Sequence, residues 1–316
     1  MKKTKKRRKQ RLLTKENRPR SKGKAPHQSV HKLKTQDAFK FLKALEPSSA
    51  DLIVSSPPYC MGKEYDTSNS IDQFLKDHRK LAPLLCRALK PGGSLCWQVG
   101  HFVKDGAVIP LDALIYLIFR KQKELTLRNR IVWTFGHGLH ATNRFSGRHE
   151  TIMWFTKKGR QHKFDLNAVR IPQKYPGKKY YKGSKNGQWS GNPKGKNPTD
   201  VWDIPNVKAN HVEKTDHPCQ FPVAIAQRLV KALTSRNDFV VDPFMGSGTT
   251  AVAAALEGRR FAGCDIERTY VKIARGRLGD IKAGKLKYRP LERPIYQPTG
   301  NDSVSRRPKH FAAADS

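Results

Sequence analysis

A glycine turn between two apolar runs gives the strongest indication of how this chain folds. The segment reads Asp242-Pro243-Phe244-Met245-Gly246-Ser247-Gly248-Thr249-Thr250, after the apolar residues 239–241 and before the alanine-rich residues 251–256. This pattern predicts a strand, a tight turn and a helix, whose first N–H groups and positive dipole end face the turn. Residues 260–264 predict a second strand that ends at Asp265, where an acidic side chain is placed to accept the two hydroxyls of a ribose. We therefore expect a nucleoside-binding site here.

Strand and helix patterns alternate along most of the chain. Further strands are expected at residues 30–33, 51–54, 94–99, 130–135 and 151–155. Further helices are expected at residues 38–45, 71–89, 111–121, 223–233 and 268–278. The alternation predicts an α/β fold with a doubly wound, mostly parallel sheet that is covered on both faces.

A second candidate site follows the expected strand at residues 51–54. That strand runs directly into Ser56-Pro57-Pro58-Tyr59. Two consecutive prolines end a strand and stiffen the backbone, so they would hold Ser56 and Tyr59 in fixed directions. In an open α/β sheet, ligands bind at this carboxyl end of the strands.

The charge of the chain points to a polyanionic partner. The 316 residues include 62 Lys and Arg against 26 Asp and Glu, a formal net charge of +36. Nucleic acid suits this imbalance better than a membrane, because no apolar run is long enough to span a bilayer and no amphipathic basic helix is evident. Five scattered cysteines indicate a reducing cytoplasm, and neither they nor His149-Glu150 have the spacing of a metal site.

Residues 157–216 differ from the rest of the chain because apolar periodicity gives way to Gly, Lys, Asn, Pro and aromatic residues. Basic residues interleaved with aromatic ones suit contact with phosphates and bases. With two arginines that precede this stretch, the candidate DNA-contacting residues are Arg144, Arg148, Lys178, Lys179, Tyr180, Lys182, Lys185, Lys194 and Lys196.

The order of these motifs resembles that of the S-adenosylmethionine-dependent DNA amino-methyltransferases, in the circularly permuted beta group, where the target-amine motif precedes the cofactor motif. The matching features occur in the order Asp37, residues 56–59, residues 89–93, the basic insertion, residues 220–222, residues 242–250 and Asp265. The resemblance implies a basic arm (1–28), a catalytic half (29–156), a target-recognition insertion (157–216), a cofactor-binding half (217–284) and a loose tail (285–316).

The resemblance also implies roles for individual residues. Ser56 and the Pro57 carbonyl, held by Pro58, would accept the N–H groups of the target amine, and Tyr59 would stack on a base flipped out of the duplex. The residues that it implies for S-adenosylmethionine are Asp37, Gln220, Phe221, Pro222, Asp242, Phe244, Gly246, Ser247, Gly248, Thr249 and Asp265. Glu150 is expected beside the target pocket.

Among the enzymes that methylate exocyclic amines, Ser56 favours those that act on cytosine N4, with adenine N6 as the alternative. Pro218-Cys219 is similar to the dipeptide of cytosine C5 methyltransferases, but here it precedes the cofactor motif, which argues against that chemistry. A non-enzymatic basic DNA-coating protein is a more distant alternative. The expected partner is double-stranded DNA, with a restriction endonuclease acting on the same site without direct contact. The chain is expected to act as a monomer or homodimer in a prokaryotic or phage-infected cytoplasm.

Overall fold

A computed structural model describes residues 31–59, 70–138 and 140–297, with residues 299, 302 and 306. The predicted basic arm at residues 1–28 lies outside the described residues, as does most of the tail after residue 297. Within the described residues, no helix is long and apolar enough to cross a membrane.

Eight strands of the described chain form one sheet in the order β1, β10, β9, β2, β3, β7, β6 and β8. The strands are β1 (His31–Thr35), β2 (Ala50–Ser55), β3 (Leu89–Val99), β6 (Leu125–Thr134), β7 (His149–Lys157), β8 (Val201–Asp203), β9 (Phe239–Asp242) and β10 (Arg260–Asp265). Neighbouring strands are parallel except where β7 pairs antiparallel with both β3 and β6. The predicted doubly wound, mostly parallel sheet is therefore confirmed.

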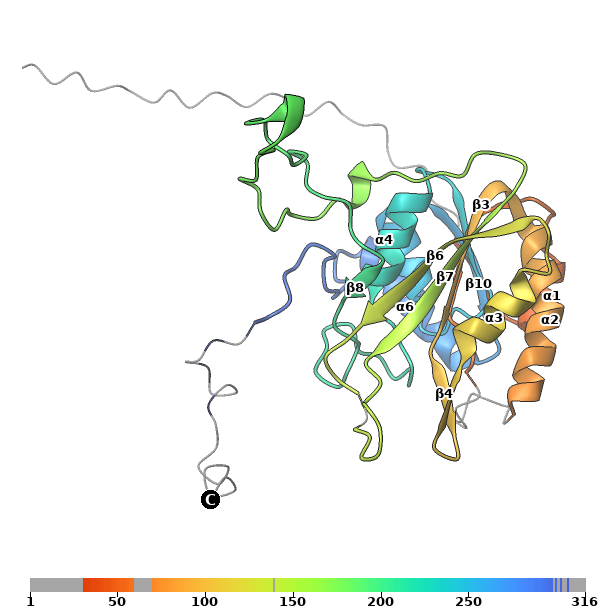
Figure 1. Cartoon of the computed structure of the whole chain (residues 1–316). Helices are drawn as coiled ribbons and strands as arrows, with labels where there is room; N and C mark the ends of the chain where they lie inside the picture. The colour runs from red at the N-terminus through yellow and green to blue at the C-terminus, as the bar shows by residue number, and fades with distance from the viewer. Residues whose placement is uncertain are drawn as a thin grey trace, which may run out of the picture.

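Three helices cover each face of this sheet (Figure 1). One face carries α4 (Val223–Leu233), α5 (Thr249–Leu256) and α6 (Arg268–Lys282), and the other carries α1 (Ala38–Lys43), α2 (Ile71–Ala88) and α3 (Leu111–Phe119).

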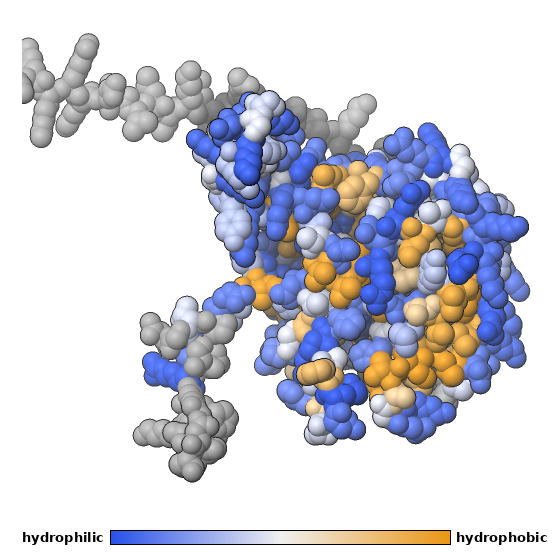
Figure 2. All heavy atoms as spheres, in the orientation of Figure 1, coloured by the Kyte–Doolittle hydropathy of each residue, from blue (hydrophilic) through white to orange (hydrophobic). Residues whose placement is uncertain are grey.

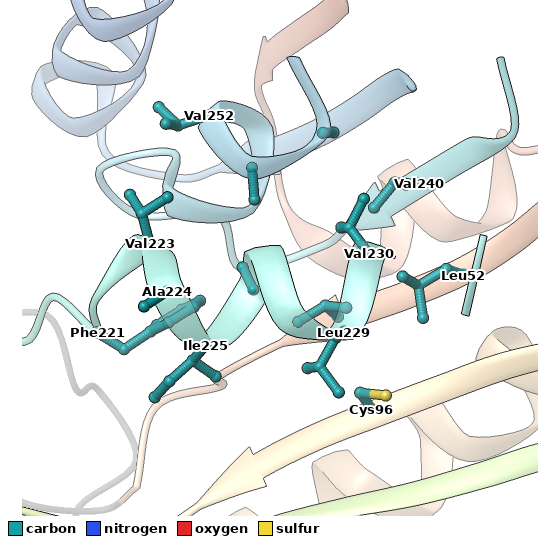
Figure 3. Close-up of a cluster of buried hydrophobic side chains, with 14 of the residues drawn as sticks. Leu52, Cys96, Phe221, Val223, Ala224, Ile225, Leu229, Val230, Val240 and Val252 are labelled. Atoms are coloured by element: carbon teal, nitrogen blue, oxygen red, sulfur yellow. The ribbon is translucent and has the colours of Figure 1, made fainter. Parts of the chain in front are cut away.

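The central strand β2 supplies side chains to both layers because successive residues point to opposite faces. Leu52 packs in the cluster that includes Leu229 and Val230 of α4, which Figure 3 shows in detail. Ile53 packs in the cluster of the opposite face, with Phe74 and Leu85 of α2. A strand with apolar residues on both sides is typical of a covered parallel sheet.

Two features differ from the sequence-based expectation. Strands β4 (His101–Lys104) and β5 (Ala107–Pro110) form a separate hairpin that the sequence analysis did not predict. Strand β8 lies inside residues 157–216, where no regular structure was expected, and it pairs with β6 over three residues. Both are short strands, and short elements carry little periodic signal in the sequence.

Much of the stretch at residues 157–216 projects from the body as an arm (residues 171–196), drawn in green in Figure 1 and mostly hydrophilic in Figure 2. Isolated bridges between Ile171 and Lys196 and between Lys179 and Trp189 hold its two sides together. The chain reaches the arm from the end of β7 at Lys157, which pairs with Leu125 at the start of β6. The arm therefore departs from the edge of the sheet opposite to the carboxyl ends of the parallel strands.

Candidate functional site

The ends of the neighbouring strands β2 and β9 are joined by a buried hydrogen bond. The Ser55 hydroxyl donates to Asp242 Oδ1 over 2.6 Å, and both side chains are fully buried. Residues 56–59 continue from one of these strand ends and the glycine turn continues from the other. The structure thus brings together the two segments that the sequence analysis had singled out independently.

Asp242 is a carboxylic acid whose surroundings disfavour its charge. Burial raises the pKa of Asp242 to about 6, although the hydrogen bond from Ser55 lowers it in part. The Phe244 backbone N–H also donates to Asp242 Oδ1, over 3.1 Å. Two donors on one oxygen fix this carboxyl group at the start of the turn.

The glycine turn needs its glycines for conformation and for space. Gly246 has φ +47° and Gly248 has φ +76°, both in the left-handed region that favours glycine. A Cβ on Gly248 would lie 2.6 Å from the Cβ of Ala274 in α6, so a side chain there would separate the turn from that helix. At Gly246 a Cβ would lie 2.7 Å from Nε2 of His217, which therefore covers the turn.

Arg277 of α6 supports the turn from inside the protein. Its side chain is buried, and its Nη1 donates to the Ser247 carbonyl over 3.0 Å and to Thr249 Oγ1 over 3.2 Å. Sequence reasoning missed this residue, because a lone arginine in an amphipathic helix reads as a solvent-facing charge.

Asp265, at the end of β10, also binds the turn. Its Oδ2 accepts from the Gly246 N–H and its Oδ1 accepts from the Glu267 N–H, each over 2.9 Å. A carboxylate has about four acceptor positions, so Asp265 keeps capacity for further donors. Burial raises its pKa.

Three carboxyl groups gather at this end of the sheet. Asp37 follows β1 and caps helix α1, and β1 pairs with β10 up to Asp265. Asp37, Asp242 and Asp265 all lie near enough to Cys264 to raise the pKa of its thiol, in addition to the larger effect of burial. Such a set suits a ligand that carries hydroxyl and amine donors and a positive charge.

Residues 220–222 lie against the same turn. The Thr249 hydroxyl donates to the Phe221 carbonyl over 3.2 Å. The Gln220 side chain is occupied within the protein: its Nε2 donates to the Glu213 carbonyl and its Oε1 accepts from Thr215 Oγ1, both over 2.8 Å. Gln220 therefore shapes this wall of the site through its loop contacts, and Pro222 is the N-cap of α4.

Tyr59 is held in a polar network beside Ser56. Its hydroxyl lies 2.6 Å from Ser56 Oγ, 3.2 Å from the Gln98 carbonyl oxygen and 3.3 Å from Glu150 Oε2. The Gln98 side chain donates to the same Glu150 oxygen over 2.7 Å. Burial, reinforced by the charge of Glu150, holds the pKa of Tyr59 well above its ordinary value. The phenol is therefore neutral at physiological pH.

The structure divides the candidate DNA-contacting residues into two groups. Arg144 and Arg148 lie in the connection from β6 to β7, at the carboxyl edge where Ser56 and Tyr59 lie. The second group lies on the arm at the opposite edge, and comprises Lys178, Lys179, Tyr180, Lys182, Lys185, Lys194 and Lys196.

On the arm, lysines sit over exposed aromatic rings. Lys179 Nζ lies 4.6 Å from the centre of the Trp189 ring, and Lys185 Nζ lies 5.8 Å from that of Tyr180. The arm thus presents cations and flat apolar surfaces together, as the sequence pattern predicted.

Comparisons with known proteins agree with this geometry. The profile of a family described as DNA methylase matches residues 50–276. The type II methyltransferase M.BglII of Bacillus subtilis is 47% identical over 250 residues, which cover 79% of this chain and 69% of that protein. M.ScaI of Streptomyces caespitosus is 37% identical over 249 residues, which cover 77% of this chain and 79% of that protein.

Solved structures share the fold. The PvuII DNA methyltransferase, described as cytosine-N4-specific, superposes with a TM-score of 0.61 at 21% identity, covering 78% of this chain and 85% of that one. A DNA modification methylase of Thermus thermophilus, in complex with S-adenosyl-L-methionine, gives 0.57 at 26% identity, covering 84% of this chain and all (100%) of that one.

Proposed function

The chain belongs to the N6/N4 family of DNA methylases and uses S-adenosylmethionine, and from this premise we propose that it methylates the exocyclic N4 of cytosine in duplex DNA at a short specific sequence. The observation that carries the proposal is the hydrogen bond from Ser55 to Asp242. Because of it, the segment that would hold the target amine and the turn that would hold the cofactor start from adjacent strand ends.

The cofactor would be held by the carboxyl edge of β1, β9 and β10. Asp265 would accept the ribose hydroxyls, Asp37 would lie near the adenine amine, and the turn at residues 244–249 with residues 220–222 would surround the methionine portion. When bound, S-adenosylmethionine supplies an electrophilic methyl group on a positively charged sulfur. The carboxylates of Asp37, Asp242 and Asp265 suit a ligand of that charge.

The target amine requires orientation, because its lone pair is delocalised into the base and makes it a poor nucleophile. Ser56 Oγ and the Pro57 carbonyl can accept the two N–H groups of the amine and so direct its lone pair. The Tyr59 hydroxyl, at 2.6 Å, fixes the orientation of the Ser56 hydroxyl. Since Tyr59 is neutral, its ring offers an uncharged face on which an extruded base can stack.

Adenine N6 is a second candidate for the methylated atom. A relative from Escherichia coli K12 named DNA adenine methyltransferase YhdJ is 28% identical over 246 residues, which cover 77% of this chain and 79% of that protein. Adenine and cytosine present the same amino group next to a ring nitrogen, so the residues around Ser56 suit either base. The serine at position 56 favours cytosine, and the choice between them rests on this residue.

Sequence specificity is assigned to residues 157–216, whose lysine and aromatic side chains suit contact with DNA. A restriction endonuclease that cuts the same site would be the functional counterpart, as the type II names of the relatives suggest, without direct contact. The protein would act as a monomer or homodimer in a prokaryotic cytoplasm.

Mass spectrometry of nucleosides tests the proposal. Unmethylated DNA is incubated with the protein and S-adenosylmethionine that carries a deuterated methyl group, so that new methylation differs in mass from any earlier mark. We expect deuterated N4-methylcytosine, and its loss in the Ser56→Ala variant. Deuterated N6-methyladenine would select the second candidate, and labelled C5-methylcytosine or no labelled nucleoside would refute the proposal.

A further inference from the structure

The connection between β6 and β7 ends in a loop tip (residues 140–148) that lies beside the candidate target site. Strand β6 ends at Thr134, which pairs with His149 at the start of β7, so the loop leaves the sheet at its carboxyl edge. Figure 1 shows it in yellow-green, extending from the same edge of the sheet as the hairpin that contains β4. The next residue of β7, Glu150, lies 3.3 Å from the hydroxyl of Tyr59. The loop tip and the target site are therefore joined through two residues of one strand.

Phe145 projects fully into solvent at this loop tip. Its side chain is 100% exposed, more than any other large hydrophobic side chain in the described part of the protein. The loop itself is braced: the Ala141 N–H donates to Ser146 Oγ over 3.0 Å. Gly147 packs so closely on His101 of β4 that a Cβ there would lie 2.5 Å from the imidazole ring. The exposed ring is thus carried by a loop that is fixed on both sides of it.

The surroundings of Phe145 are cationic. Residues 135–149 contain two arginines and three histidines, and no Asp or Glu. Arg144 precedes Phe145 directly and Arg148 follows three residues later. An apolar protein partner would not select this surface, whereas a polyanion with flat apolar faces inside it would.

We propose that Phe145 inserts into the base stack of the DNA substrate and occupies the space that the target base leaves when it is extruded. This inference rests on the proposed function, because only an enzyme that acts on an extruded base creates such a space. Apolar side chains inserted between bases are a known way to stabilise unstacked DNA, and Arg144 and Arg148 would hold the neighbouring phosphates. Phe145 then acts before methyl transfer, by stabilising the duplex without its target base in place.

The test compares Phe145→Ala with the wild-type enzyme in single-turnover methylation. The substrates are two oligonucleotide duplexes that carry the site methylated by the wild type, one with the target base paired and one with it mispaired. On the paired duplex we expect a rate decrease of between about tenfold and about a hundredfold, which corresponds to the loss of one aromatic–base stack. On the mispaired duplex, where extrusion costs less, we expect a rate close to that of the wild type.

Three controls define the result. Phe145→Trp keeps a stacking surface and should retain most of the activity on the paired duplex. Leu117→Ala removes a half-exposed apolar side chain from the outer face of α3 and should leave both rates unchanged. The affinity for S-adenosylmethionine should not change in Phe145→Ala, because the loop tip lies outside the cofactor residues.

Equal rates of Phe145→Ala and wild type on the paired duplex would overturn the inference, and so would an equal loss on both duplexes. If the wild-type enzyme methylates no exocyclic amine at all, the proposed function fails instead. The two failures are therefore distinguishable in the same set of reactions.

Discussion

Replacing Ser55 with alanine removes the hydrogen bond that joins the two strand ends of the site. The bond is short, at 2.6 Å, and both partners are fully buried, so no water can replace the lost donor. A hydrogen bond to a charged group contributes about 1.5–3 kcal/mol, and one to a neutral group contributes about 1 kcal/mol. The cost of Ser55→Ala therefore depends on whether Asp242 is ionised.

The pKa of Asp242 gives the pH at which this cost changes. Its value is about 6 in the folded protein against 3.8 for an ordinary aspartate, so the folded state binds more protons between these two values and stability falls as pH rises through them. Removing the Ser55 donor disfavours the carboxylate further and should raise the pKa by about one more unit. We expect Ser55→Ala to lower the free energy of unfolding by about 1 kcal/mol at pH 5 and by about 2 kcal/mol at pH 8.

Urea unfolding at the two pH values measures this difference, with Ser94→Ala as the matched control. Ser94 is also a buried serine in a neighbouring strand, but its hydroxyl accepts from the neutral Trp154 indole N–H over 3.1 Å. Its replacement should cost the same at pH 5 and pH 8. If both variants show the same pH dependence, the Ser55 hydroxyl does not stabilise an ionised Asp242 and the reasoning fails.

Three further perturbations follow from the site. Asp265→Asn should raise the dissociation constant for S-adenosylmethionine by about tenfold or more, because hydrogen bonds to a carboxylate are the stronger kind; calorimetry measures it, and an unchanged affinity would contradict the ribose assignment. Tyr59→Ala should lower single-turnover methylation by about a hundredfold or more and Tyr59→Phe by less than about tenfold, since Phe keeps the ring; equal losses would show that the hydroxyl, not the ring, matters. Arg277→Met should destabilise the protein by about 1–3 kcal/mol and weaken cofactor binding, because the Ser247 carbonyl and the Thr249 hydroxyl lose a buried donor; Arg277→Lys should restore part of both in urea unfolding and calorimetry, and no restoration would argue for packing alone.

The sequence predicted the parts of the fold that depend on local signals. The apolar run at residues 239–241, the two glycines of the turn and the alanine-rich helix after it are adjacent in the chain, so one local pattern indicated strand, turn and helix. The same holds for the strand before Ser56, which the two prolines end. The alternation of strands and helices then indicated the doubly wound class without any knowledge of contacts.

Contacts between distant strands could not be predicted in this way. Gln98 reads as one polar residue within an apolar strand, and nothing in the sequence links it to Glu150, which is 52 residues away and pairs with it across β3 and β7. The antiparallel direction of β7 was not predicted either, since it depends on how the chain returns to the sheet. Arg148 and Lys178 appeared to belong to one basic region, yet β7 carries the chain between opposite edges of the sheet.

The length of β7 sets how much DNA the enzyme has to cover. Nine residues of strand span about 30 Å, which is close to the roughly 34 Å of one B-DNA helical turn. A duplex that met both Arg148 and the lysines of the arm would therefore run along the protein for about ten base pairs. The extruded base would lie at one end of this footprint, so protection from nuclease digestion should extend further on one side of the modified position than on the other.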